Sequence, residues 1–118
     1  MMTNICSEQL SKSRDFYTKL FDFAVDYDSD WFVHLISKDK QLELGIIDIN
    51  SDVVPKDIRK QPTGTYITFV VDDVDAVFIV AESNKFEVVL SPEDTFYGQR
   101  RMLLKDPNNY IIDISSPK

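Results

Sequence analysis

The spacing of hydrophobic positions switches between two periods along the chain, and each period predicts a type of element. Apolar residues three and four apart predict two helices, Leu10–Phe21 and Val74–Ser83. Ser11 or Ser13 is the expected N-terminal cap of the first helix. Alternating or β-branched runs predict strands. The expected strands lie within 1–9, Phe23–Tyr27, Trp31–Ser37, Gln41–Asp48, Thr65–Val71, Phe86–Leu90, Gln99–Lys105 and Tyr110–Ser115.

Turn-forming residues separate these elements. Pro55, Pro62 and mixed charges mark 49–64 as a connecting segment, and Pro92 marks a loop over Ser91–Thr95. The run Asp106-Pro107-Asn108-Asn109 predicts a tight turn in which Asn109 has a positive φ, because Asn tolerates that conformation.

The predicted elements repeat. A strand, a helix and three strands are followed by the connecting segment and then by the same series. We therefore expect one α+β domain over 1–118, with a first βαβββ module at about 1–48, a linker at 49–64 and a second module at about 65–118. With one helix on one face of each sheet, the opposite faces are free to curl into a shared concave cavity. An open α+β sandwich without a cavity is the alternative.

Charge and composition narrow the class of protein. The chain has 118 residues, with 13 Lys+Arg against 20 Asp+Glu, which gives a net charge of −7. This balance argues against a nucleic-acid partner, because phosphate neutralisation needs basic side chains. No apolar run approaches the ~18 residues of a membrane span, so no membrane partner is expected. The start MMTNICSEQL lacks signal-peptide features and Cys6 is the single cysteine, which together predict a cytoplasmic protein.

Several chemistries are excluded by residue counts. One histidine, His34, and one cysteine cannot build a zinc finger or a cysteine-rich cluster. Three glycines are too widely spaced for a phosphate-binding loop. If the protein is an enzyme, it works with carboxylates, arginine and tyrosine, with or without a metal ion.

Four stretches carry a resemblance to a known family. They are S-K-S-R-D-F-Y-T-K-L-F-D-F at 11–23, L-E-L-G at 42–45, Y-I-T-F-V-V-D-D-V-D at 66–75 and Y-G-Q-R-R-M-L-L-K-D-P-N-N-Y-I-I-D-I at 97–114. Together they resemble the vicinal oxygen chelate superfamily of glyoxalases, extradiol dioxygenases, fosfomycin-resistance enzymes and bleomycin-binding proteins. Asn109 stands where relatives usually have Gly. The resemblance implies the glyoxalase/bleomycin resistance fold and a homodimer.

The same resemblance implies where a metal ion would be bound. Metal-dependent members hold a divalent ion with four side chains, and the matching positions here are Met2, Glu43, Tyr66 and Asp113. Met and neutral Tyr are poor ligands for such ions. Two carboxylates without imidazole are too few for a stable site, so we expect no metal and no other cofactor.

Strand alternation selects the residues of the expected pocket. Gln99, Arg101 and Leu103 share one face, and Met102 and Leu104 face the helix. The predicted pocket residues are Phe32, Glu43, Tyr66, Thr68, Tyr97, Arg101 and Asp113. Tyr97 is included because bleomycin-binding relatives place an aromatic residue just before the matching glycine, along the drug groove.

Each pocket residue has a plainer interpretation. Arg101 is expected within ion-pair distance of Glu43 or Asp113. In the plainer interpretation, these charges neutralise one another at the position of the missing metal ion and bind no ligand. Tyr66 fills space equally well. Trp31 and Phe32 should alternate between faces, so that only one lines the cavity. His34 shares a face with Phe32 and is expected to be a solvated strand residue.

Three functions are compatible with these residues. The first is a metal-free, bleomycin-resistance-like protein that binds or sequesters a small aromatic or cationic molecule. The second is a lyase, isomerase or thiol transferase with Glu43 or Asp113 as a general base. The third is a structural or regulatory dimer whose cavity is filled.

Overall fold

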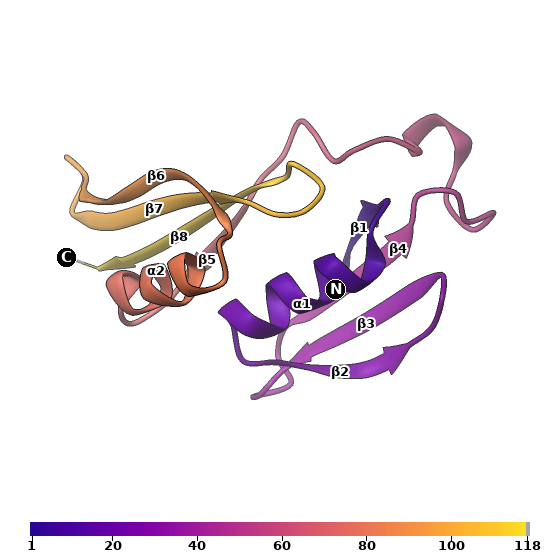
Figure 1. Cartoon of the computed structure of the whole chain (residues 1–118), viewed down its shortest axis with the longest axis horizontal. Coiled ribbons are helices and arrows are strands. Elements are labelled where there is room, and N and C mark those ends of the chain that lie inside the picture. The colour runs from indigo at the N-terminus through magenta and orange to yellow at the C-terminus, as the bar shows by residue number, and fades with distance from the viewer. Residues whose placement is uncertain (118) are drawn as a thin grey trace. The chain divides into compact units, whose positions relative to one another are not determined.

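The computed structural model describes residues 1–117 and divides the chain into two units, Met1–Pro62 and a second that begins at Thr63. Each unit combines a four-stranded mixed sheet with one α-helix (Figure 1). The predicted α+β class and the two βαβββ modules are therefore confirmed.

The first unit repeats the predicted order of elements. They are β1 (Thr3–Ser7), α1 (Leu10–Leu20), β2 (Phe23–Asp28), β3 (Phe32–Ser37), β4 (Glu43–Asp48) and the 3₁₀ turn η1 (Lys56–Ile58). The sheet has the order β1-β4-β3-β2, in which β1 runs parallel to β4 and the other pairs are antiparallel.

The second unit has the same topology. Its elements are β5 (Ile67–Val70), α2 (Val74–Ser83), β6 (Glu87–Asp94), β7 (Gln99–Lys105) and β8 (Ile111–Pro117). The sheet order is β5-β8-β7-β6, with β5 parallel to β8. In both units the first strand thus pairs with the last, and the helix provides the crossover that a parallel pair requires.

The core of each unit lies between the helix and one face of the sheet. Helix α1 packs against β2, β3 and β4, and α2 packs against β6, β7 and β8 (Figure 1). Fully buried side chains include Phe16 and Tyr17 on α1, Val33 and Leu35 on β3, and Met102, Leu104, Ile112 and Ile114 in the second unit. Each such side chain contributes about 1.5–3 kcal/mol. No helix in residues 1–117 has the length and apolar character of a membrane-spanning segment.

Because successive strand residues point to opposite faces, the buried core residues determine which side chains lie on the other side of each sheet. We call the side turned away from the helix the far face. In the second unit Met102 and Leu104 are buried under α2, so Arg101 and Leu103 occupy the far face, as predicted. The far faces are where any chemistry of these sheets must be sought, because the near faces are filled with core.

Two local predictions were wrong. The segment Ser91–Thr95 is not a loop up to Thr95, because β6 continues to Asp94 through Pro92. Pro is tolerated there since β6 is an edge strand, and its register shifts relative to β7. The cap of α1 is neither Ser11 nor Ser13: the cap residue is Gln9, and the buried Ser13 hydroxyl instead lies 2.9 Å from that of Ser7.

The turn between β7 and β8 was predicted correctly. Asn109 has a φ of 61°. Asp106 stabilises this turn, because its Oδ1 accepts the backbone N–H groups of Asn108 and Tyr110 at 2.8 and 3.0 Å. The prolyl turn therefore ends β7 and reverses the chain into β8 with its backbone groups satisfied.

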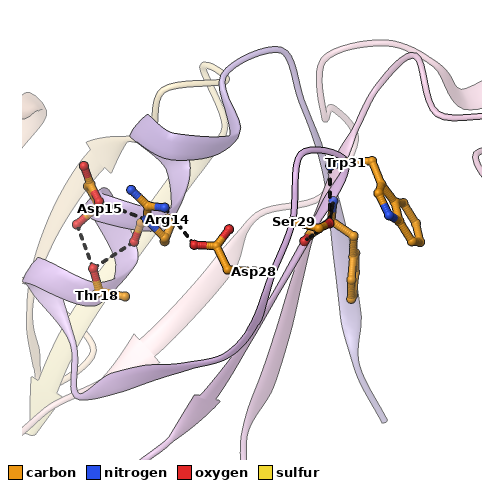
Figure 2. A network of polar contacts seen from close by, with 7 residues as sticks. Arg14, Asp15, Thr18, Asp28, Ser29 and Trp31 are labelled. Carbon is orange, nitrogen blue, oxygen red and sulfur yellow. Dashed lines mark hydrogen bonds and ion pairs between the residues drawn. The ribbon is translucent and has the colours of Figure 1, made fainter.

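An arginine fastens α1 to β2 in the first unit. The Nη1 of Arg14 lies 2.8 Å from the Asp28 carboxylate, and its Nε lies 3.2 Å from Asp15 (Figure 2). The hydrogen bond to Asp28 raises the pKa of Arg14 above its usual range. The pair holds the end of β2, and therefore the turn that follows it, against the helix.

A second arginine fastens the start of α2 to the edge of its sheet. Arg100 contacts Asp75 through Nε and Nη2 at 2.9 and 3.0 Å, and Asp94 through Nη1 at 3.2 Å. The hydrogen bond from Arg100 lowers the pKa of Asp75 below its ordinary value of 3.8. A carboxyl group whose pKa is lowered by folding stabilises the folded state above its unfolded pKa.

We therefore expect Arg100→Gln to reduce stability at neutral pH but not in strong acid. The difference in unfolding free energy between wild type and variant should be constant from pH 7 to about pH 5 and should shrink as the pH falls through 3.8 and the lower folded pKa of Asp75. Urea unfolding across this range measures it. A difference that stays constant down to pH 2 would contradict the assignment.

Candidate functional site

Asp113 is the most buried charged side chain on the far face of the second sheet. It lies on β8, opposite Thr68 of β5 on one side and Leu103 of β7 on the other. Only 7% of the residue is exposed. An isolated carboxylate in this position would be costly, so its partners decide what it does.

Both oxygens of Asp113 have partners. Arg101 Nε lies 3.3 Å from Oδ1, and the Thr68 hydroxyl donates to Oδ2 at 2.9 Å. The prediction that Arg101 lies within ion-pair distance of Glu43 or Asp113 is confirmed, and the partner is Asp113. Three of the predicted pocket residues are thus brought together on one face of one sheet.

Glu43 has a different partner from the one considered in the sequence. It stands on the far face of the first sheet, opposite Ile36, and its carboxylate lies 3.0 Å from Nε2 of His34. The other ring nitrogen of His34, Nδ1, lies 2.9 Å from Asp26. The imidazole, 18% exposed, therefore joins two carboxylates, and the prediction of a merely solvated histidine was wrong.

Sequence reasoning missed this arrangement because it did not pair β2 with β3 residue by residue. The register Val25↔Leu35, continued regularly by one residue, would place Asp26 opposite His34. A β-bulge between Val25 and Tyr27 instead pairs Tyr27 with His34, and the Asp26 carboxylate still lies 2.9 Å from Nδ1 of His34. The signal available in the sequence was that acidic residues, Asp26 and Glu43, lie on the strands expected before and after the strand of His34, the single histidine.

Three aromatic rings lie beside this charged group. The Trp31 and Phe32 ring centroids are 5.5 Å apart, and those of Tyr27 and Phe32 are 6.4 Å apart. The expectation that Trp31 and Phe32 point to opposite faces was wrong, because β3 begins at Phe32 and Trp31 belongs to the preceding turn. Tyr27 is 51% and Trp31 40% exposed, so ring surface remains available for contact.

Phe32 has its place on the far face because the neighbouring strand carries a glycine. A Cβ added to Gly45 would lie 3.0 Å from Cε1 of Phe32 and would overlap the side-chain oxygen of Asn4. His34 is the cross-strand partner of Gly45. The absence of a side chain at Gly45 thus leaves room for the ring.

The remaining predicted residues are less constrained. Tyr66 precedes β5 and is 59% exposed. Tyr97 lies in the turn between β6 and β7, edge-on to Phe96 with centroids 5.1 Å apart, and is 52% exposed. Met2 precedes β1 and is 37% exposed. Within residues 1–117 no group of three or more His, Cys, Asp or Glu side chains is arranged to hold a metal ion.

Comparison with known families identifies the fold. Residues 2–114 match the profile of the Glyoxalase/Bleomycin resistance protein/Dioxygenase superfamily. The chain belongs to this superfamily. No curated protein sequence matches it.

Several solved structures share this fold. A family enzyme from Burkholderia phytofirmans PsJN has a TM-score of 0.83 at 20% identity, with 99% of this chain and 97% of that chain covered. The fosfomycin resistance protein FosX from Listeria monocytogenes has a TM-score of 0.77 at 15% identity, with coverages of 100% and 92%. TioX from Micromonospora sp. ML1 has a TM-score of 0.74 at 14% identity, with coverages of 100% and 95%.

The residues at the superfamily's metal positions do not fit a divalent ion. Asp113 is neutralised by Arg101 and accepts from Thr68, and Glu43 is bonded to His34. Met2 and Tyr66 offer a thioether and a phenol, which are poor donors to hard cations. The superfamily fold is therefore combined here with side chains that satisfy one another.

We expect Arg101→Ala to destabilise the protein by about 2 kcal/mol, between the values for exposed and for buried ion pairs, because it leaves the carboxylate of Asp113 without its cation. Chemical unfolding at pH 7 measures the loss. Arg101→Lys, which keeps the charge, should recover part of it. A loss no larger than that of Lys19→Ala, on the surface of α1, would contradict a structural role for the pair.

We expect Gly45→Ala to disturb the aromatic rings as well as stability. The new methyl group must displace Phe32 or Asn4, at a cost of about 1–3 kcal/mol. Since Trp31 is the single tryptophan, its near-ultraviolet circular dichroism reports the displacement. An unchanged aromatic spectrum together with an unchanged melting temperature would show that a methyl group fits at position 45 without displacing Phe32 or Asn4.

Proposed function

We propose that this protein binds or sequesters a small aromatic or cationic organic molecule and needs no metal ion to do so. The observation that carries the proposal is the exposed ring surface of Tyr27 and Trp31, both in contact with Phe32. His34, the cross-strand partner of Tyr27, contacts the carboxylates of Asp26 and Glu43. Apolar walls with a few convergent polar groups are typical of small-ligand sites.

Rings and carboxylates suit the same kind of ligand. A stacked aromatic pair is worth about 0.5–1.5 kcal/mol beyond its buried area, and a cation over an aromatic face gains a comparable amount. His34 carries at most one positive charge against the two carboxylates that it joins, so this group is negative overall. The net charge of −7 also favours the approach of a cation.

The wider site is part of the proposal. We assign Tyr66, Thr68, Tyr97, Arg101 and Asp113 a role in ligand contact as well as Phe32 and Glu43, and we propose that the chain acts as a cytoplasmic homodimer. Superfamily membership supports this assignment. On the far face of the second sheet, Thr68 and Arg101 are already paired with Asp113, so these polar groups are ordered before any ligand binds.

One observation favours a second function. Glu43 is hydrogen-bonded to an imidazole that is itself oriented by Asp26, an arrangement suited to proton transfer. As a lyase, isomerase or thiol transferase, the protein would use Glu43 as its general base. Asp113 suits this role less well, because Arg101 and Thr68 occupy both of its oxygens.

The test is binding of N-methylquinolinium, a flat aromatic cation, measured by calorimetry with and without a chelator. We expect the chelator to leave the affinity unchanged. Glu43→Gln should weaken binding roughly fivefold, equivalent to ~1 kcal/mol for one partly exposed charge. Glu82→Gln on α2 removes the same charge elsewhere and should leave binding unchanged.

Two results would overturn the proposal. One is the absence of binding by the wild-type protein. The other is a tightly held divalent ion, one per chain by elemental analysis, whose removal abolishes binding.

A further inference from the structure

We propose that the turn Ser29–Trp31 holds Trp31 and Phe32 in place before a ligand arrives, and that Ser29 is the positioning residue of a stacking surface for flat aromatic cations. This inference rests on the proposed function and specifies its ligand class. It starts from a hydroxyl group that contacts no ligand.

Ser29 fixes the backbone of both aromatic residues. Its Oγ donates to the carbonyl of Phe32 at 2.8 Å and accepts the N–H groups of Phe32 and Trp31 at 3.0 and 3.3 Å (Figure 2). The backbone N–H of Ser29 also donates to the Phe32 carbonyl, at 3.0 Å. One side chain therefore satisfies the polar groups of a three-residue turn that would otherwise be free to change conformation.

The residues on either side of the turn are anchored separately. Asp28 is held by Arg14 of α1 at 2.8 Å (Figure 2). The carbonyl of Trp31 accepts the N–H of Asp48, at the end of β4, at 2.8 Å. The two ends of the turn are therefore held by α1 and by the end of β4. Between these ends, the hydrogen bonds of Ser29 set the backbone angles.

The rings have an arrangement suited to a flat ligand. Trp31 and Phe32 are inclined by 32°, and Tyr27 and Phe32 by 35°. Two other ring pairs, Phe16–Tyr17 and Phe96–Tyr97, meet at 78° and 90°. Inclinations of about 30° present ring faces in nearly the same direction, whereas edge-to-face pairs do not. A planar molecule can cover such a ring face, whereas a tetrahedral cation of equal charge contacts it only through a few methyl groups.

The charge of the surroundings selects among flat molecules. Asp30 lies in the turn itself and is exposed, and Asp26 and Glu43 both contact His34, which lies two residues along β3 from Phe32. Ordering side chains at the moment of binding weakens association, so a surface ordered in advance binds more tightly. Loss of the Ser29 hydroxyl should therefore weaken stacking while leaving the charge of the surface unchanged.

The experiment compares two cations on four proteins. N-Methylquinolinium is planar and tetramethylammonium is not, and both carry one positive charge. The proteins are wild type, Ser29→Ala, Ser29→Thr and Ser37→Ala. Ser37 is the matched control, because its hydroxyl also organises a turn, donating to Asp39 and accepting the N–H of Leu42, between β3 and β4.

We expect Ser29→Ala to weaken binding of the planar cation about tenfold and to lower the fluorescence anisotropy of Trp31, the single tryptophan. Binding of tetramethylammonium, which contacts a ring face only through methyl groups, should weaken much less. Ser29→Thr keeps the hydroxyl and should restore both readouts. Ser37→Ala should lower the melting temperature by a similar amount without affecting either cation.

The outcomes separate this inference from the function on which it rests. If wild type binds neither cation, the proposed function fails. If wild type binds the planar cation and Ser29→Ala binds it equally well, or loses no more than Ser37→Ala, only the positioning role fails. Equal loss of both cations in Ser29→Ala would show that the turn acts through charge or folding instead of stacking.

Discussion

Burial of one face of each sheet beneath a single helix is the constraint on which the other features depend. Successive residues of a strand point to opposite sides, so filling the near face with Leu35, Met102 or Ile112 assigns their neighbours to the far face. Arg101, Asp113 and His34 are placed in this way. A shift of one residue in the pairing register of a strand would move each far-face charge into the core and each core residue onto the far face. The register that packs the core therefore also places the charged side chains.

The far-face charges are largely satisfied within each sheet. Asp113 is paired with Arg101 and Thr68, and Glu43 and Asp26 share His34. These contacts involve the carboxylates of Glu43 and Asp113, two of the four positions that the family resemblance implies as metal ligands. The rings of Tyr27 and Trp31, in contrast, are 51% and 40% exposed. Recognition by stacking and net charge is the function that we propose for these exposed rings.

The sequence predicted the features that depend on periodicity and local turn chemistry. Both helices and the repeated topology follow from spacing, and the positive φ of Asn109 follows from its residue type. The prediction that Arg101 pairs with Glu43 or Asp113 came from strand alternation together with the family resemblance, and the partner is Asp113. The features that were missed depend on which strands pair and where each strand ends. The contact of Asp26 with His34 requires the pairing of β2 with β3, and the start of β3 at Phe32 leaves Trp31 in a turn. Bulges and strand ends are fixed by pairing with neighbours distant in sequence, which a residue pattern does not record.

The parallel pairing of first and last strands has a consequence for how each unit is assembled during synthesis. Within residues 1–117, β8 is the strand that pairs with β5, and the Thr68 hydroxyl donates to a carboxylate 45 residues further along the chain. Closing such a long segment carries an entropic cost that local hairpins do not, and it slows folding. Strands β6, β7 and β8 can form an antiparallel meander first. The site charges on β7 and β8 then come together before the strand that completes their hydrogen bonding is in place.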